Sequence, residues 1–192
     1  MAQSPTKKQQ THARILDAAS QSFRSSGYAG TGVDGIAKAA GVTSGAFYAH
    51  FGSKDGAFEA ALAAGMDEVI ESIPNLQREF GLDWVGAFAD YYLGEAHRND
   101  LTYGCAMTTL SPEVARADPH MHMAYETKMN RIVGLIADGL GGNSKEGRHA
   151  RSWAMLSTLI GGLTLSRAVA NPDIANEIAA AARAAAVAAS KG

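Results

Sequence analysis

The chain of 192 residues is 46% hydrophobic and 19% charged, which is enough apolar content to bury a globular core. No apolar run approaches the roughly 18 residues of a membrane span, and residues 1–11 are polar where a signal peptide would be apolar. The single cysteine, Cys105, excludes an internal disulfide framework and a zinc site built from cysteines. We therefore expect a cytoplasmic protein that has no membrane partner.

Charge is unevenly distributed along the chain, although its overall net value is only −2. Residues 1–54 carry six Lys or Arg against two Asp or Glu, a net charge of +4, whereas the remaining 138 residues carry a net charge of −6. Neutralisation of phosphates supplies much of the affinity for nucleic acid, so a small basic module is typical of a DNA-binding domain joined to a larger one. Chance asymmetry in a soluble protein is the alternative on charge alone.

Hydrophobic spacing predicts four helices in the N-terminal part of the chain. An apolar stripe that includes Phe23 marks the first helix, which Gly27 is placed to end. Ser53 is an N-cap for the fourth helix, and Pro74 closes it. The expected helices cover residues 7–26, 33–40, 43–51 and 54–73.

The rest of the chain is also predicted to be helical, because no segment alternates as a strand does. The expected helices cover residues 83–98, 103–117 with an interruption at Pro112, 119–140, 145–169 and 172–190. Gly141, Gly142 and Asn143 form a break. The fold class is therefore all-α. We expect a three-helix DNA-binding domain over residues 1–54, with about the first six residues disordered, and a helical effector-binding and dimerisation domain over residues 55–192.

A dense motif occupies the two short helices and their surroundings. It combines a Gly-aromatic pair, a Thr before the second helix, a Val-x-x-Ile-Ala core, a Gly-Val turn, a helix that ends in Tyr-x-His-Phe, and a Lys at the next helix. The residues that carry it are Gly27, Tyr28, Thr31, Val33, Ile36, Ala37, Gly41, Val42, Tyr48, His50, Phe51 and Lys54. This motif closely resembles the helix-turn-helix domain of TetR-family (TetR/AcrR-type) transcriptional regulators, although Gly32 stands where many members have Ser or Thr. The C-terminal two thirds resemble the family only in being helical.

The same residues have a physical interpretation. Apolar positions such as Ile36 and Phe47 are spaced to hold two crossing helices against the first one, which leaves the other face of residues 43–50 free to enter a major groove. Recognition helices contact base edges near their N-terminus and phosphates near their ends. We expect base-edge contacts from Thr43, Ser44 and Gly45 and phosphate contacts from Tyr48, His50, Lys54, Lys38 and Thr31. Packing of Tyr48 on the core, and capping of its own helix by His50, are the structural alternatives.

An effector pocket is expected among the helices that follow, by resemblance to the family. Apolar and hydroxyl-bearing side chains could line it, although each could equally be a core residue. The candidate lining residues are Met66, Trp84, Phe88, Tyr91, Tyr92, Cys105, Met107, Tyr125 and Met129. Cys105 also follows a glycine, as in a TetR subgroup with members that sense oxidants or electrophiles through cysteine. An inert buried thiol is the alternative.

Three other patterns do not predict a site. Gly30, Gly32 and Gly35 spell G-x-G-x-x-G, but a helix precedes them where a dinucleotide-binding motif needs a strand. His120 and His122 are two residues apart and so diverge on a helix, which disfavours metal binding. No arrangement of nucleophile, base and orienting group indicates an enzyme, and no cofactor is expected.

The helix over residues 145–169 is apolar around much of its circumference, which predicts burial on all sides. Pairing with the last helix, and with the same two helices of a second subunit, gives a four-helix bundle. The interface residues expected there are Trp153, Leu156, Ile160, Gly161 and Leu163. The sequence thus predicts a homodimeric regulator of a palindromic operator, a repressor by family resemblance, that a small effector releases. The alternatives are a repressor that senses through Cys105 and a helical interaction protein without DNA activity.

Overall fold

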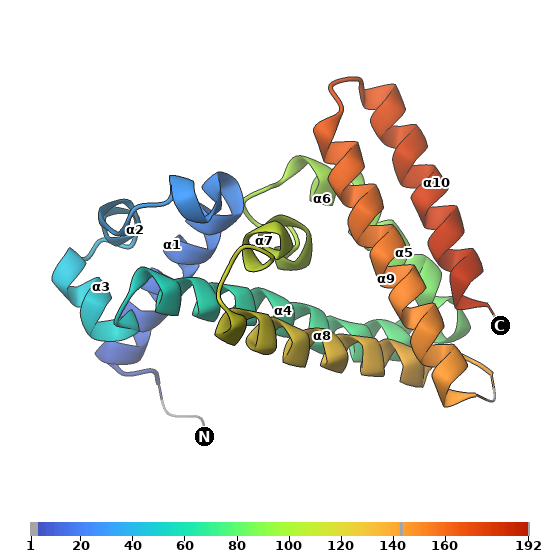
Figure 1. Ribbon diagram of the computed structural model, residues 1–192, viewed down its shortest axis with the longest axis horizontal. Helices are drawn as coiled ribbons and strands as arrows, with labels where there is room; N and C mark the ends of the chain where they lie inside the picture. Colours follow the sequence, from blue (N-terminus) through green and yellow to red (C-terminus); the bar gives the residue numbers. More distant parts are fainter. Residues whose placement is uncertain (1–3, 143, 192) are drawn as a thin grey trace.

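The structure is a computed structural model that describes residues 4–142 and 144–191, and these residues form ten α-helices and one 3₁₀ helix (Figure 1). The elements are α1 (Lys7–Gly30), α2 (Val33–Ala39), α3 (Ser44–Phe51), α4 (Lys54–Phe80), η1 (Gly81–Asp83), α5 (Trp84–Leu93), α6 (Glu95–Asn99), α7 (Ala106–Val114), α8 (Pro119–Gly139), α9 (Lys145–Ala168) and α10 (Pro172–Ser190). The part of the chain that the structure describes contains no strand, which confirms the all-α prediction. No helix there is long and apolar enough to cross a membrane.

The elements lie in two groups that α4 joins (Figure 1). Helices α1, α2 and α3 gather around the N-terminal end of α4, and α8 runs beside the remainder of α4. Helices α9 and α10 form an antiparallel pair at the opposite end of the molecule, and α7 lies between that pair and α1. Helix α4 therefore connects the predicted DNA-binding region to the C-terminal helices.

The start of α1 is capped more firmly than the predicted N-terminal disorder implies. Thr6 accepts a hydrogen bond from the Gln9 backbone, and the Gln9 side chain accepts one from the Thr6 backbone, which is a complete capping box. Residues 1–3, to which the expectation of disorder also applied, lie outside the described residues. At its other end, α1 kinks at Gly27, whose φ of 68° favours glycine, before it continues to Gly30.

Two proline predictions are wrong. Pro74 lies inside α4, which continues to Phe80, and Pro112 lies inside α7 without interrupting it. A proline removes one backbone hydrogen bond from a helix, but packing can compensate for that loss. In α4 the segment beyond Pro74 is held by α8, because Gln77 Nε2 donates to the Leu135 carbonyl at 2.8 Å.

Two helix boundaries also differ from the sequence-based expectation. The helix expected over residues 83–98 is divided at Gly94, whose ψ of 154° is extended. A Cβ there would lie 2.8 Å from the Asp90 carbonyl oxygen, so this close approach needs glycine. Helix α7 begins at Ala106 rather than at Tyr103, and Cys105 is its N-cap. Of the predicted Gly141-Gly142-Asn143 break, Asn143 lies outside the described residues, and Gly142 takes a φ of 108°.

Gly65 of α4 sits where three elements meet, and this generates a stability prediction. A Cβ at Gly65 would lie 2.5 Å from Ala106 Cβ of α7 and 2.5 Å from Arg24 Nη2 of α1. We expect Gly65→Ala to lower the free energy of unfolding by about 1–3 kcal/mol through overpacking, measured by urea denaturation. Gly134→Ala in α8 is the matched control, because a Cβ there meets nothing within 4 Å and should stabilise by about 0.5–1 kcal/mol. Equal effects of the two substitutions would contradict the close contact.

Candidate functional site

The recognition helix α3 is held by a small apolar core. Phe47 and Ile36 are fully buried, and Val42 packs against the same core. Gly41 makes the turn between α2 and α3 with a φ of 65°, which is a conformation that favours glycine. Thr43 then caps α3, because its hydroxyl accepts from the Ala46 backbone at 3.2 Å. The core therefore fixes which face of this eight-residue helix points outward.

The outward face of α3 carries most of the residues expected to contact DNA. Thr43 and Gly45 are exposed, and Tyr48 is 51% exposed while its ring packs edge-on against Phe47. Ser44 is half-buried, and its hydroxyl donates to the Asp34 carboxylate of α2 at 2.6 Å. Sequence reasoning missed this partner, which orients Ser44 and ties the two short helices together.

The expected phosphate contacts divide into two groups. Lys38 is exposed, and Lys54 is half-buried, with its ammonium 4.1 Å above the centre of the Tyr28 ring. His50 is half-buried, with its ring centre 5.6 Å from that of His12. Thr31 is different, because it is buried and its hydroxyl lies 2.8 Å from the Gly27 carbonyl oxygen. Thr31 therefore stabilises the end of α1, and its side chain does not face outward.

Tyr28 and Asp55 join the end of α1 to the start of α4. The Tyr28 hydroxyl donates to the Asp55 carboxylate, and this bond raises the pKa of Tyr28 to about 12. The Tyr28 ring also meets Phe58 of α4 edge-on, with 5.4 Å between the ring centres. Lys54 above the same ring adds a cation–π contact. The motif residues Tyr28 and Lys54 thus also fasten α1 to α4.

Most of the expected effector-pocket residues are buried and belong to the hydrophobic core. Those that are buried are Met66, Trp84, Phe88, Tyr92, Cys105, Met107 and Met129. Tyr125 is half-buried, and Tyr91 is 65% exposed. Two hollows lie elsewhere, and among the predicted residues only Trp84 borders one of them, a groove of about 1010 Å³ beside α5 and the end of α10. The other, of about 180 Å³, lies between Tyr28 and Asp55 on one side and Glu113 and Met121 on the other.

The predicted dimer residues are also divided. Leu156 and Leu163 are fully buried within one chain, so their assignment to the interface is wrong and they belong to the subunit core. Trp153, Ile160 and Gly161 are half-buried. A helix that is apolar on all sides was expected to be covered by a partner, but α10 and α8 of the same chain already cover much of α9.

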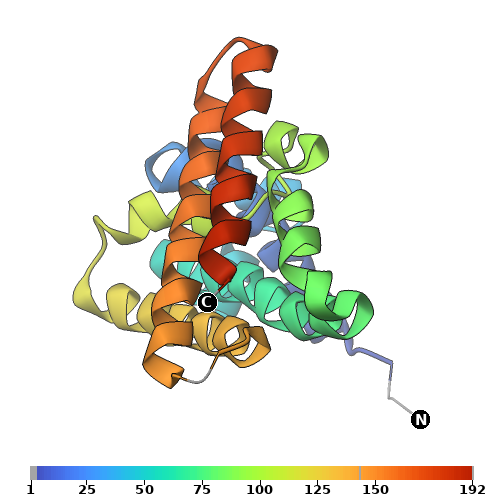
Figure 2. The ribbon, with the colours of Figure 1, turned by 90° about the vertical axis from the view of Figure 1, so that its right-hand side faces the viewer.

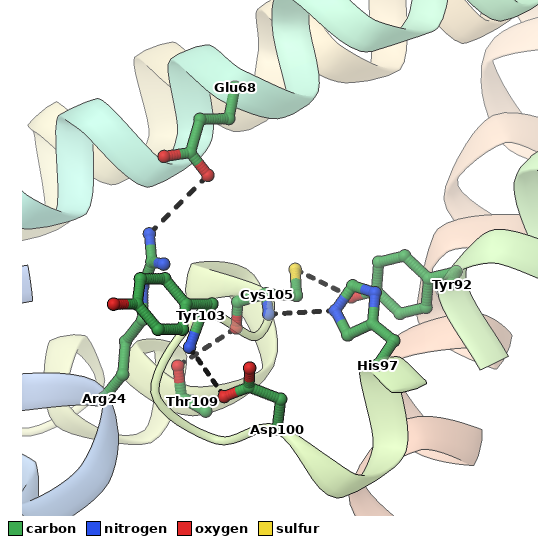
Figure 3. Close-up of polar contacts among 8 residues, drawn as sticks. All are labelled: Arg24, Glu68, Tyr92, His97, Asp100, Tyr103, Cys105 and Thr109. Atoms are coloured by element: carbon green, nitrogen blue, oxygen red, sulfur yellow. Dashed lines mark hydrogen bonds and ion pairs between the residues drawn. The ribbon is translucent and has the colours of Figure 1, made fainter. Parts of the chain in front are cut away.

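A polar cluster lies around Cys105 inside the C-terminal region (Figure 3). The Tyr92 hydroxyl donates to Cys105 Sγ at 3.1 Å and lies 2.9 Å from Thr108 Oγ1. The Cys105 backbone N–H donates to His97 Nε2 at 2.9 Å, so this nitrogen carries no proton. Burial raises the pKa of Tyr92 well above its ordinary value, which keeps the phenol neutral and able to donate.

Two arginines next to this cluster were missed by the sequence reasoning. Arg24 of α1 is buried and reaches Glu68 of α4 at 3.8 Å, as Figure 3 shows. Arg167 of α9 donates to the His97 carbonyl at 2.6 Å. A signal for Arg24 existed, because it follows Phe23 directly and lies four residues after the buried Ser20 in the same helix. The same pattern marks Arg167, which directly follows the buried Ser166 and lies four residues after the buried Leu163 in α9.

Two further patterns in the sequence, a histidine pair and a G-x-G-x-x-G run, were not expected to form sites. No group of three or more His, Cys, Asp or Glu is placed to hold a metal ion within the described parts of the chain. Of the glycines in the G-x-G-x-x-G pattern, Gly30 ends α1, Gly32 is the N-cap of α2 and Gly35 lies in α2, so a helix precedes them as expected.

Comparison with known proteins agrees with this arrangement. Residues 15–61 match the family model described as bacterial regulatory proteins, tetR family. Solved structures of similar fold include a TetR-family transcriptional regulator from Cytophaga hutchinsonii, with a TM-score of 0.78, 15% identity and coverage of 97% of this chain and 98% of that one. A TetR regulator from Chloroflexus aurantiacus has a TM-score of 0.76 and 22% identity over 93% of this chain and 94% of that one. The comparison with curated proteins found no match.

The fold and the exposed recognition helix define the class, an all-helical protein with an N-terminal helix-turn-helix. The family model matches residues 15–61, so this segment resembles the DNA-binding region of the tetR family, and the fold of the whole chain is that of the solved TetR-family regulators.

His97 generates a prediction for the dependence of stability on pH. Burial, and then the positive charge of Arg167, lower the pKa of His97. A depressed pKa contributes stability that is present above the unfolded-state pKa of about 6.5 and is lost as the pH falls towards the folded-state value. We expect the free energy of unfolding to decrease below about pH 6.5. His97→Gln, which retains an acceptor for the Cys105 N–H, should flatten this decrease in urea titrations, whereas His122→Gln on the exposed face of α8 should not. The same decrease in wild type and His97→Gln would contradict the assignment.

Proposed function

We propose that this protein is a repressor that binds a palindromic operator as a homodimer and that a small effector releases it. The observation that carries the proposal is the geometry of α3. Its buried Phe47 fixes the helix, and its outward face presents Thr43, Gly45 and Tyr48. A helix-turn-helix that exposes the N-terminal part of its second helix is built to enter a major groove.

The outward face of α3 fits the division of DNA contacts. Thr43 and Gly45 are small, so the duplex can approach the start of the helix closely enough for base-edge contacts. Tyr48 and Lys54 lie near the end of α3 and the start of α4, where phosphates pass in such complexes. The excess of basic residues in this domain supplies the favourable field.

Dimerisation is proposed through the outer face of the α9–α10 pair. Figure 2 views the molecule from the side on which α9 and α10 lie foremost, with no other part of the chain in front of them. Exposed small residues recur along both helices, and Leu165 of α9 is a large apolar residue among them with 59% of its surface exposed. Ile174 of α10 is 45% exposed. The same faces of a second subunit complete a four-helix bundle.

Helix α4 provides the connection between an effector and DNA. Its first turns pack against α1, and its later turns pack against α8 and α5. An effector that prefers a tilted α4 shifts the population away from the state that has both recognition helices at groove spacing, about 34 Å apart. A hundredfold preference corresponds to about 2.7 kcal/mol, which is enough to release a useful fraction of operators.

Sensing through Cys105 remains the second candidate, and one contact favours it. The Tyr92 hydroxyl donates to Cys105 Sγ, a hydrogen bond that would also stabilise a thiolate there. The thiol is buried, so an oxidant or electrophile would need the surrounding loop to open.

The proposed DNA contact of Lys54 is tested by the salt dependence of binding to the DNA upstream of the protein's own gene. Lys54→Gln should weaken binding to all sequences alike and reduce the slope of log K against log salt by about 0.9 per subunit, the value for one phosphate. Lys145→Gln is the matched control, because Lys145 is exposed at the far end of the molecule. An unchanged slope removes Lys54 from the phosphate contacts. Failure of the wild type to retard this DNA at low salt contradicts the regulator and favours the interaction protein.

The proposed dimer is tested by a pair of substitutions two residues apart in α9. Leu165→Arg adds a charge to the exposed face, so the subunit should stay folded but sediment as a monomer. Tight operator binding should then be lost, because the monomer has only one recognition helix. Leu163→Arg buries an unpaired charge in the subunit core at a cost of several kcal/mol, so it should unfold the chain. Circular dichroism and sedimentation velocity distinguish the two results. A dimeric Leu165→Arg protein with unaltered operator affinity would show that the interface lies elsewhere.

A further inference from the structure

The N-terminus of α7 is buried and has no side-chain cap. Ala106, Met107 and Thr108 form its first turn, and all three are buried. Their N–H groups have no partner within the helix, because the first turn of any helix lacks preceding carbonyls. Cys105, the N-cap residue, makes no capping hydrogen bond with its side chain. A buried helix end of this kind attracts an acceptor, and the helix dipole favours a negatively charged one.

Arg24 supplies a second and independent indication of an anion. Its side chain is only 6% exposed, and its Nε atom has no hydrogen-bond partner among the described residues. The guanidinium lies against the start of α7, because Arg24 Nη2 and Ala106 Cβ are both 2.5 Å from the same point, the position of a Cβ on Gly65. Glu68 at 3.8 Å is mostly exposed, so it compensates this buried charge only weakly.

Arg167 brings another guanidinium to the same helix end. Its Nη2 occupies the space that a Cβ on Gly104 would take, one residue before the cap of α7. Nη2 donates to two backbone carbonyls, those of His97 and Asp100, whereas the buried Nε and Nη1 have no partner within the described chain. No carboxylate of the described residues lies within 4 Å of this side chain to form an ion pair. Arg167 as a whole is half-buried, but unpaired donor atoms that are themselves buried are costly unless an anion accepts from them.

We propose that the first turn of α7, together with Arg24 and Arg167, binds the carboxylate group of a small organic acid. A carboxylate is planar and has two oxygens, which suits the planar donor fork of a guanidinium, and it also suits the N–H groups of a helix N-terminus. The acid would enter past the loop that precedes α7, where Leu101 and Tyr103 are exposed. Figure 3 shows Tyr103 in this loop, where its backbone N–H donates to Asp100. An apolar body on the acid would pack against these side chains.

This site joins the effector domain to the DNA-binding domain. Arg24 belongs to α1, Arg167 to α9 and the helix end to α7, so one bound carboxylate contacts all three elements. The charges of Arg167 and Arg24 both lower the pKa of His97, after the larger effect of burial, which places both within range of the same ring. The role of the acid as the effector rests on the proposed function. Its binding does not depend on DNA.

The probe is sodium benzoate, with benzamide as the neutral control of the same shape, at constant ionic strength. In NMR titrations of the full chain, benzoate should shift the amide signals of Ala106 and Met107 saturably, and benzamide should not. Arg24→Gln and Arg167→Gln should each weaken benzoate binding by about tenfold or more, because each removes a charge-assisted hydrogen bond. Arg183→Gln is the control, because Arg183 is paired with Asp90 at the surface. If Arg24→Gln does not fold, Arg167→Gln decides alone.

The outcomes separate this proposal from the function proposed above. Equal binding of benzamide, no shift at Ala106 and Met107, or unchanged affinity in the folded arginine variants overturns the carboxylate site. Operator binding by the wild type is measured in the same buffers. Benzoate binding without release of DNA leaves the carboxylate site standing and contradicts its role as the effector site. Release of DNA by benzoate that persists in both variants also contradicts it.

Discussion

Helix α4 runs through one continuous hydrophobic core that joins the N-terminal helices to the C-terminal ones, and the rest of the structure depends on that sharing. Near its start, the Phe58 ring meets Phe23 of α1 edge-on, with 5.2 Å between the ring centres. Further along, Met66 and Ile73 of α4 are fully buried in the same core. Because α4 is packed at both ends, it cannot tilt among the C-terminal helices without also moving against α1. The packing therefore couples the position of α3 to movements of α7 and α8.

The N-terminal third was predictable because local signals and tertiary packing agree there. Gly27 and Gly41 were placed at turns by sequence, and both adopt positive φ. The apolar spacing that includes Phe47 and Ile36 also gave the right inner face for α2 and α3. Consistency of this kind is what makes a short helix specifiable by its own residues. Thr31 is the exception, because a hydroxyl suits a phosphate contact as well as a backbone contact.

The C-terminal region was predicted correctly as helical but not in its use of apolar faces. An amphipathic stripe predicts that one face of a helix is buried, but it does not predict whether the same chain or a second chain covers that face. Leu163 illustrates this, because it is buried by its own subunit while Leu165, two residues later, remains exposed. The same ambiguity applies to Met66 and Phe88, since core and pocket linings share one composition. Pro74 failed for a related reason, because tertiary packing outweighs a local helix-breaking tendency.

The interior of the molecule also holds charged groups that lack some of their hydrogen-bond partners, and these groups bear on how the molecule changes conformation. Arg24 and Arg167 have donors without partners, and both lie against the start of α7. An apolar side chain at either place would be expected to give a more stable protein. The hydrophobic core around α4 stabilises the fold. The incompletely compensated charges of Arg24 and Arg167 make the region where α1, α7 and α9 meet easier to rearrange. Binding energy gained where α1, α7 and α9 meet would therefore act directly on α1, and through α1 on the recognition helix that it supports.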